Sequence, residues 1–405
     1  MMQGDEPQTS SAFPESPSGV VILGGAHGTL ALARSLGRQN IPVWLISNDN
    51  PLPGWSRYVQ RTLSWRGPGS ADAAAFLLKA ANAHHLEGFL LVPAGDAEVR
   101  FVSETREVLS ASFRIRLPGW NDLKWVCEKP LLYRRAAELG LDIPVTHSFA
   151  SFDEAARATL RYPIVLKPNM GGGHDPFSRA KVVRADDRAS FLAAYKEAAE
   201  QISPGNVVVQ ELIPGGGESQ FSYAALWSDG RPVAEFTARR TRQYPVEFGY
   251  TSTYVEVVEA PAAMEAARRI LDSIRYSGLV EIEFKHDRRD GKLRLLDVNP
   301  RPWSWFGLAS AAGTDFGAML WAVARGENVE PLSARLNVSW MYLVRDLAAA
   351  GKLIATGHLH MGEYLHSFTN VRAWATFSVF DVVPALIDIP LTAWRVLTRR
   401  LFKIY

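Results

Sequence analysis

Short apolar runs and amphipathic stretches alternate over the first quarter of the chain. Residues 20–23 and 43–46 are apolar runs of strand length, and apolar positions with helical spacing lie between them as far as Leu36. A third apolar run covers residues 89–92. Strands that alternate with helices in this way form βαβ units, so the pattern predicts a doubly wound α/β domain over residues 19–118.

The pattern changes in the middle of the chain, where helices and strands mix before strands dominate. It predicts helices and strands at the following positions: helices over 129–139, 191–201 and 261–275, and strands over 163–167 and 207–210. Gly140 is suited to end the first of these helices. Two apolar arms, 278–285 and 295–299, enclose a charged turn and predict a β-hairpin, and residues 306–327 are more helical.

The length and composition are those of an ordinary globular protein. A chain of 405 residues with 47% apolar and 21% charged residues can bury two or three cores. We expect an α/β fold in four parts. They are a disordered start (1–18), a Rossmann-like domain (19–118), a two-lobed α+β region (119–330, with lobes 119–210 and 211–330) and a C-terminal helical extension (331–405).

Charge and cysteine content narrow the classes of function. A formal net charge of +2 gives no general attraction for nucleic acid, which we do not expect as a partner. The single cysteine, Cys127, cannot form an internal disulfide and fits the reducing environment of the cytoplasm, the localisation we expect. Residues 1–18 are polar and lack the apolar segment of a signal peptide.

A glycine-containing turn follows the first predicted strand. Gly24, Gly25 and Gly28 lie there, but a dinucleotide-binding fingerprint requires glycine at position 23, where the chain has Leu23. Asp49 could still hold a ribose. NAD binding therefore stays open beside two other interpretations, a structural turn without a phosphate and a pocket for a carboxylate substrate.

Polar side chains converge on the predicted hairpin. Glu283 lies on the first arm, and Asp297 and Asn299 share one face of the second, because side chains alternate along a strand. Hard oxygen ligands on a rigid hairpin suit Mg²⁺ that also contacts nucleotide phosphates. The alternative is a solvated hairpin with ordinary surface acids, but the apolar pair Pro302 and Trp303 follows shortly after, where further charge would be expected.

Two lysines and a glycine-rich loop precede the hairpin. Lys167 ends a predicted strand shortly before the loop Gly171–Gly172–Gly173, and Lys129 begins a predicted helix. Lysine charges and glycine amides in such places can contact phosphate oxygens. Taken singly, each lysine is more typical of an exposed side chain and the loop of a flexible connection.

The order of these segments resembles the ATP-grasp superfamily, and most of all its carboxylate–amine ligase branch. The resemblance covers residues 19–330 and depends on six short motifs: Glu128-Lys129, Gly140-Leu-Asp-Ile-Pro144, Ile164-Val-Leu-Lys167, Gln210-Glu211-Leu-Ile-Pro-Gly215, Glu283-Phe-Lys-His-Asp287 and Leu296-Asp297-Val-Asn299-Pro-Arg301. It implies a Rossmann-like pre-ATP-grasp domain and an ATP-grasp domain that holds ATP, with Mg²⁺ or Mn²⁺, between its two lobes.

The resemblance also implies roles for individual residues. Those that would contact ATP are Lys129 and Lys167 at the phosphates, Gly171, Gly172 and Gly173 in the loop over them, Gln210, Glu211 and Ile213 around the adenine, and Glu218 at the ribose. Glu283 and Asp297 would bind a first metal ion, Asp297 and Asn299 a second, and Arg301 would stabilise an acyl phosphate. The family usually has glutamate where this chain has Asp297, which leaves the number of metal ions open.

A second charged cluster follows at residues 239–242. Arg240 and Arg242 should share one face of a strand while Arg239 points away. Two guanidinium groups in one pocket suit a carboxylate substrate or a transferring phosphoryl group. The alternative is an exposed strand edge protected by charge.

The reaction implied by the resemblance joins a small-molecule carboxylate to an amine. The carboxylate would attack the γ-phosphate of ATP, and the amine would then attack the acyl phosphate, releasing ADP and phosphate in total. Three alternatives stay open: a carboxylase that activates bicarbonate, a non-catalytic nucleotide-binding or sensor protein, and a dehydrogenase.

The last twenty residues form an amphipathic pattern. Leu397 and Leu401 fall on one helical face with Trp394, and Arg395 and Arg399 lie beside them. This suits peripheral contact of residues 385–405 with a membrane surface, and the alternative is a helix docked on the protein itself. A homodimer is a further expectation for the whole chain.

Overall fold

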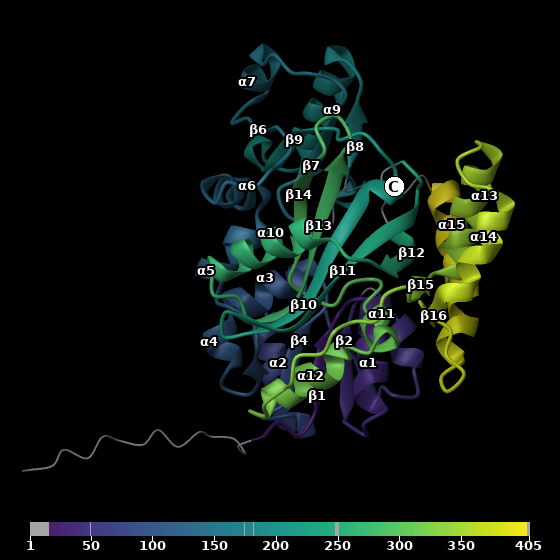
Figure 1. The fold of residues 1–405 in the computed structure, drawn as a ribbon. Helices are drawn as coiled ribbons and strands as arrows, with labels where there is room; N and C mark the ends of the chain where they lie inside the picture. Colours follow the sequence, from purple (N-terminus) through teal and green to yellow (C-terminus); the bar gives the residue numbers. More distant parts are fainter. Residues whose placement is uncertain (1–15, 49, 174, 181, 248–250, 403–405) are drawn as a thin grey trace, which may run out of the picture.

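The computed structural model describes residues 16–48, 50–173, 175–180, 182–247 and 251–402, with side chains described up to residue 394. Asp49, considered above as a ribose ligand, and residues 1–15 of the expected disordered start lie outside the described residues. Figure 1 shows three sheets with helices packed around them and a group of C-terminal helices along one flank.

The first sheet is parallel and has the strand order β3-β2-β1-β4-β5. Its strands are β1 (Val20–Leu23), β2 (Val43–Ser47), β3 (Arg61–Ser64), β4 (Leu90–Pro93) and β5 (Arg114–Ile115). The associated helices are α1 (His27–Gly37), η1 (Leu52–Trp55), α2 (Ala73–His84), α3 (Asp96–Glu104) and α4 (Arg106–Leu109). All four residues of β1 are fully buried, as expected for a central parallel strand covered on both faces.

The second sheet is small and antiparallel, with the order β6-β9-β7-β8. Its strands are β6 (Thr146–Ser148), β7 (Ile164–Pro168), β8 (Val183–Ala185) and β9 (Val207–Glu211). Helices α7 (Phe152–Arg157), α8 (Pro176–Ala180), α9 (Arg188–Gln201) and η2 (Pro204–Asn206) complete this lobe, and α5 (Trp120–Cys127) and α6 (Lys129–Glu138) precede it. Its separate core includes Phe149, Phe191 and Tyr195, so the lobe has packing of its own.

The third sheet has seven strands in the order β14-β13-β10-β11-β12-β15-β16. They are β10 (Gln220–Ser228), β11 (Arg231–Tyr244), β12 (Thr251–Val257), β13 (Gly278–Asp287), β14 (Lys292–Asn299), β15 (Ser339–Met341) and β16 (Val371–Trp374). Helices η3 (Gly217–Ser219), α10 (Pro261–Asp272), α11 (Gly307–Ala312) and α12 (Phe316–Ala324) accompany them. The predicted hairpin is therefore the edge pair β13–β14 of the largest sheet.

The C-terminal segment is helical, as expected, and it also adds the last two strands to the third sheet. Its helices are α13 (Leu343–Ala355), α14 (Met361–Ser367), η4 (Phe368–Asn370) and α15 (Val383–Phe402). Among the described residues, no helix combines the length and the apolar character needed to cross a membrane.

A buried ion pair joins this segment to the first domain. The Arg34 Nε donates to Asp381 Oδ2 at 2.8 Å, and both side chains are almost inaccessible. The same carboxylate accepts from Ser56 Oγ at 2.7 Å, and Arg34 Nη2 donates to the carbonyl oxygens of Thr376 and Asp381. The turn before α15 is thus fixed against α1 and η1.

Removal of the Asp381 carboxylate should destabilise the fold. Asp381→Ala leaves the buried Arg34 charge without its counter-ion, so we expect the free energy of unfolding to fall by about 3–5 kcal/mol. Glu104→Ala, in the exposed pair Arg100–Glu104, is the control and should cost less than about 1 kcal/mol. Guanidinium-induced unfolding of both variants measures the difference, and equal stabilities would contradict the assigned role of the pair.

Candidate functional site

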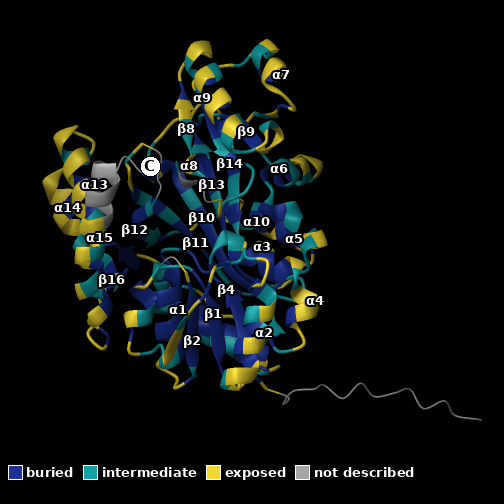
Figure 2. Cartoon of the chain, turned by 180° about the vertical axis from the view of Figure 1, so that it is seen from behind, coloured by how far each residue is buried: buried dark blue, intermediate teal, exposed yellow. Residues whose placement is uncertain are grey.

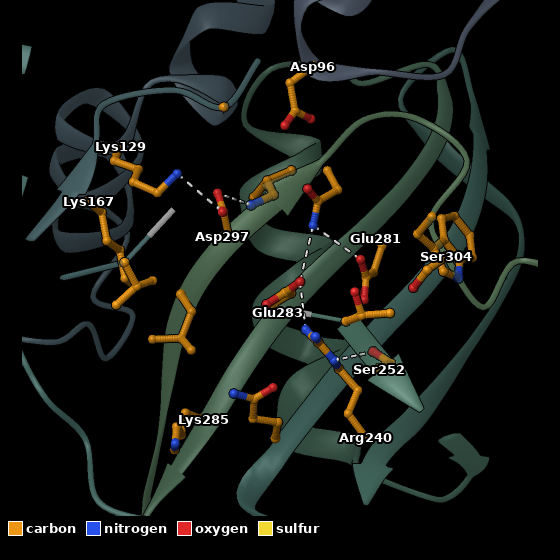
Figure 3. A pocket seen from close by; sticks show the side chains of 18 of the residues that line it. Asp96, Lys129, Lys167, Arg240, Ser252, Glu281, Glu283, Lys285, Asp297 and Ser304 are labelled. Atoms are coloured by element: carbon orange, nitrogen blue, oxygen red, sulfur yellow. Dashed lines mark hydrogen bonds and ion pairs between the residues drawn. The ribbon is translucent and has the colours of Figure 1, made fainter. Parts of the chain in front are cut away.

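A cavity of about 520 Å³ lies where the three sheets meet. Its walls come from the start of α3, the strands β7 and β9 of the small lobe, and the inner face of β13–β14 with its neighbour β11. Figure 3 shows the polar side chains that point into this space. The volume falls within the ordinary range for a small-molecule site.

The hairpin divides its side chains between the cavity and the core. Val280, Ile282 and Phe284 of β13 are fully buried in a hydrophobic cluster, so the residues between them face the other side of the sheet. The strand register sets Glu281 opposite Asn299 and Glu283 opposite Asp297. Four oxygen-bearing side chains consequently lie within one small area of the cavity wall.

Each of these acids has a polar partner in the structure. Glu283 Oε1 lies 2.7 Å from Arg240 Nη1, and Asp297 Oδ2 lies 3.2 Å from Lys129 Nζ. The Asn299 Nδ2 donates to Glu281 Oε2 at 3.1 Å and to Glu283 Oε1 at 3.4 Å. Figure 3 shows two groups of contacts on the hairpin: Lys129 with Asp297, and a second group that includes Glu281, Glu283 and Arg240.

The donor set fits a metal ion that is shared with a phosphate ligand. Within the described ranges, no three His, Cys, Asp or Glu side chains form a group that could hold a metal alone. Two carboxylates, Glu283 and Asp297, with an amide oxygen are what Mg²⁺ uses when phosphates and water complete its shell. Asn299 Oδ1 accepts from Arg301 Nη2 at 3.0 Å, so its coordination to a metal requires the amide to turn.

Two lysines line the cavity, Lys167 on β7 and Lys285 on β13. The Lys167 Nζ donates to Gln210 Oε1 at 3.0 Å, and burial together with the charge of Lys129 lowers the pKa of Lys167 to about 8. The Lys285 Nζ donates to the Gly215 carbonyl at 2.6 Å, and burial lowers its pKa to about 8. Lysines whose charge is destabilised in this way gain most from an anionic ligand.

Two arginines complete the site near the end of the hairpin. Arg240, on β11, is buried and donates from Nε to Ser252 Oγ at 2.7 Å. Arg301, just after β14, forms an ion pair with Asp96 at the start of α3. The second contact connects the hairpin to the first domain across the cavity.

Two residues expected at the site lie elsewhere. Arg242 is not at the cavity, because Asp346 of α13 accepts from both its Nε and Nη2, at 2.9 and 2.8 Å, and the Tyr254 ring lies 4.1 Å from its guanidinium carbon. The register of β11 with β12 shifts between Arg239 and Arg242, so strict alternation does not hold there. Glu218 lies outside the cavity lining and pairs with Arg288 at 3.2 Å.

The glycine loop packs against the start of α3. Gly171 lines the main cavity, while Gly172 and Gly173 line an adjoining cavity of about 410 Å³. Gly172 has a φ of +90°, and a Cβ there would lie 2.7 Å from the Ala97 backbone nitrogen. Both the backbone conformation and the close approach therefore require glycine.

The strand β9 and the segment directly after it supply the remaining expected residues. Gln210, Glu211 and Ile213 all line the cavity. Gln210 is buried, and its Nε2 donates to Thr146 Oγ1 at 3.1 Å. The Glu211 carboxylate turns toward an adjacent segment of the same chain, where it accepts from the Val145 backbone N–H at 2.9 Å. The backbone of Glu211 therefore faces the cavity.

Sequence reasoning missed Glu281, Asp96 and Lys285. Glu281 is buried, accepts from Ser222 Oγ at 2.8 Å, and has its pKa raised to about 7 by burial and by the neighbouring Glu283. Its spacing of two from Glu283 on a strand was a usable signal for a shared face. Asp96 carried no such signal, because its contact with Arg301 joins segments that are 205 positions apart.

The turn after β1 is closed by the chain itself. A Cβ at Gly28 would lie 2.5 Å from the Trp303 carbonyl oxygen, and one at Gly25 would lie 2.8 Å from that of Ala94. These glycines permit close packing of protein backbone against the turn, as the interpretation of a structural turn requires.

No family model matches the sequence, and no curated protein sequence matches it. Solved structures do share its fold. The L-amino acid ligase from Bacillus licheniformis is 16% identical, with a TM-score of 0.61 over 80% of this chain and 79% of that chain. The phosphoribosylamine–glycine ligase from Thermotoga maritima is 17% identical, with a TM-score of 0.59 over 78% of each chain.

A third similar structure is the biotin carboxylase domain of the Hydrogenobacter thermophilus 2-oxoglutarate carboxylase, solved with MgADP and bicarbonate. It is 15% identical, with a TM-score of 0.62 over 80% of this chain and 73% of that chain. At such identities the likeness establishes the fold. The α/β fold expected from the sequence, a doubly wound domain followed by a two-lobed α+β region, is confirmed.

The buried charge of Lys285 should make stability depend on pH. A lysine with a folded-state pKa of about 8 adds stability as the pH rises toward its unfolded value of about 10.4, because the unfolded chain then binds more protons. Lys285→Met should remove that gain, so the stability of wild type relative to the variant should increase between about pH 7.5 and pH 9.5.

Chemical unfolding at the two pH values measures this difference. The exposed Lys79→Met is the matched control and should track the wild type. Parallel pH dependence of the wild type and Lys285→Met would show that the folded protein does not destabilise the Lys285 charge.

Proposed function

We propose that the protein is an ATP-dependent ligase that activates a small-molecule carboxylate as an acyl phosphate and joins it to an amine, releasing ADP and phosphate. One observation carries the proposal. Carboxylates and an amide on β13–β14 face lysines and arginines across a closed cavity, in a fold shared with ligases that make C–N bonds. Such an arrangement suits the polyanionic transition state of phosphoryl transfer.

ATP would lie between the small lobe and the hairpin. Lys129 and Lys167 face the acids from α6 and β7 and would contact the phosphates. Gln210 and the backbone of Glu211 and Ile213 would border the adenine. Lys285 lines the cavity, but Glu218 does not. We therefore assign no ribose contact to Glu218.

Glu283, Asp297 and Asn299 would hold the divalent cation, Mg²⁺ or Mn²⁺, which supplies neutralisation of phosphate charge when bound. Binding of a cation and a nucleotide would exchange partners within the network. Lys129 now neutralises Asp297, and Arg240 now neutralises Glu283, so both would become available to phosphate or substrate oxygens. Coordination by Asn299 would turn its amide and release Nδ2 from Glu281.

Arg240 and Arg301 would orient the substrate carboxylate, and Arg242 would not contribute. Both of the first two line the cavity beside the acids, and both are fixed by side chains of other elements, Ser252 and Asp96. A carboxylate oxygen held there would attack the γ-phosphorus, forming the acyl phosphate and breaking the bond to ADP. Arg301 would then stabilise the charge of the new acyl phosphate.

The second half of the reaction would use no side-chain nucleophile. The amine nitrogen would attack the acyl carbon, the C–O bond to phosphate would break, and the amine would lose a proton to give the amide. The protein would contribute positioning and charge stabilisation throughout. We further propose that the chain acts in the cytoplasm, that residues 19–118 form a pre-ATP-grasp domain and that residues 119–330 form the ATP-grasp domain.

Turnover should require Glu283 and a divalent cation. We expect ADP, with no AMP, when the protein is incubated with MgATP and panels of amino acids, small carboxylates and amines. Glu283→Gln should reduce ADP release by at least about 100-fold, because it removes an anionic ligand of the divalent cation. Glu327→Gln, in an exposed pair with Arg325, is the matched control and should behave as the wild type.

Chelation by EDTA should abolish turnover, and excess Mg²⁺ should restore it. Formation of AMP, or full activity in EDTA, would contradict the proposed chemistry. ADP formed with bicarbonate alone, independently of any amine, would instead identify the carboxylase alternative. Nucleotide binding without turnover on any panel would favour the sensor alternative.

A further inference from the structure

The helix α15 exposes an apolar face to solvent. Along its first three turns, the exposed positions include Val383, Leu386, Ile389 and Trp394, which recur at helical spacing. Leu386 is 65% exposed and Ile389 is 57% exposed. A helix that served only to cover the protein would turn this face inward.

The acids of this region point the other way. Asp388 is buried and accepts from the Tyr342 hydroxyl at 3.0 Å, and Asp381 is buried against Arg34. Residues 364–405 contain no other acidic residue. The amphipathic pattern is thus inverted, with polar anchors inside and apolar side chains outside.

Neighbouring elements extend the exposed apolar face. Twelve of the nineteen large apolar side chains that are exposed among the described residues lie between positions 343 and 394, although this span is about an eighth of the chain. They form what we name the C-terminal apolar surface: Leu343, Leu347, Met361, Leu365, Phe377, Val379, Phe380, Val382, Val383, Leu386, Ile389 and Trp394. Figures 1 and 2 both show α13, α14 and α15 side by side on one flank.

The charge of this segment indicates what the surface contacts. Arg395, Arg399, Arg400 and Lys403 follow within the last eleven positions, with no acid among them. A second copy of the chain would bring the same basic segment to a symmetric contact, where like charges repel. An anionic lipid surface offers both a boundary for the apolar side chains and counter-charges for the basic ones.

We propose that the C-terminal apolar surface docks on an anionic lipid bilayer, with α15 lying in the plane of the interface. The helix would place Leu386 and Ile389 at the level of the lipid chains, and Asp381 and Asp388 would hold it to the protein. This inference does not depend on the proposed reaction, because it uses no residue of the cavity.

The docking surface is connected to the cavity wall through α13. Arg345 Nη1 donates to Thr251 Oγ1 at 2.8 Å, and Lys352 Nζ lies 2.8 Å from Glu247 Oε1. Thr251 and Glu247 both line the cavity. Docking would therefore hold one wall of the cavity close to the bilayer.

Vesicle flotation with the full-length protein tests the proposal. We expect the wild type to float with phosphatidylcholine vesicles containing about 30% phosphatidylserine, and binding to weaken both without the anionic lipid and at about 0.5 M salt. The triple variant Phe380→Gln, Leu386→Gln, Ile389→Gln should bind at least about tenfold more weakly. Its thermal unfolding should match that of the wild type, because all three side chains are exposed.

A matched triple variant separates this surface from general hydrophobicity. Val108→Gln, Leu332→Gln and Leu336→Gln replace exposed apolar residues outside the C-terminal apolar surface and should leave vesicle binding unchanged. The proposal is overturned if the wild type does not float with anionic vesicles at low salt, or if both triple variants float as it does. It is also overturned if sedimentation shows a dimer that only the first triple variant dissociates, since a second copy would then cover the surface.

Discussion

The ion pairs across the cavity are the constraint on which the arrangement of the domains depends. On the hairpin, Asp297 pairs with Lys129 from α6 and Glu283 pairs with Arg240 from β11. Arg301 donates to the Asn299 amide and pairs with Asp96 of the first domain. A buried charge without a partner is costly, so each of these elements must be placed where its charge is matched. The network thereby connects all three parts of the molecule that enclose the cavity, and the same charges give the cavity its affinity for anions and cations together.

The ligand-free network also explains how a site built of opposite charges can stay available for binding. Its acids are neutralised by cations that a nucleotide would attract, and its amide is held by groups that a metal ion would replace. Replacing one partner of a buried charge by another of equal charge costs less free energy than burying a charge that has no partner. Lys167 and Lys285, whose charge is destabilised by burial, line the same cavity.

Sequence patterns predicted the parts of the fold that depend on local order. Two apolar arms around a charged turn identified the hairpin, and short apolar runs identified the parallel sheet, because both follow from burial along a strand. Strand alternation placed Arg242 wrongly, because the strand register shifts there and Arg242 donates to Asp346 instead of facing the cavity. Asp96 could not be assigned to the site from the sequence, because its contact depends on long-range pairing. The strands β15 and β16 could not be predicted either, because each is only three or four residues long and is fixed by distant partners. The spacing of apolar residues in α15 was visible, but its outward direction is set by Asp381 and Asp388 and their distant partners.

Transfer of an oxygen atom from the substrate to phosphate tests the central claim most directly, because it reports which atom attacks the γ-phosphate. The carboxylate that supports ADP release would be labelled with ¹⁸O in both oxygens, and the released phosphate would be examined by mass spectrometry. We expect one labelled oxygen in each phosphate formed, since that oxygen bridges the acyl carbon and phosphorus in the acyl phosphate. Unlabelled phosphate, formed at the same rate as the amide, would show that the carboxylate is never phosphorylated and would contradict the account.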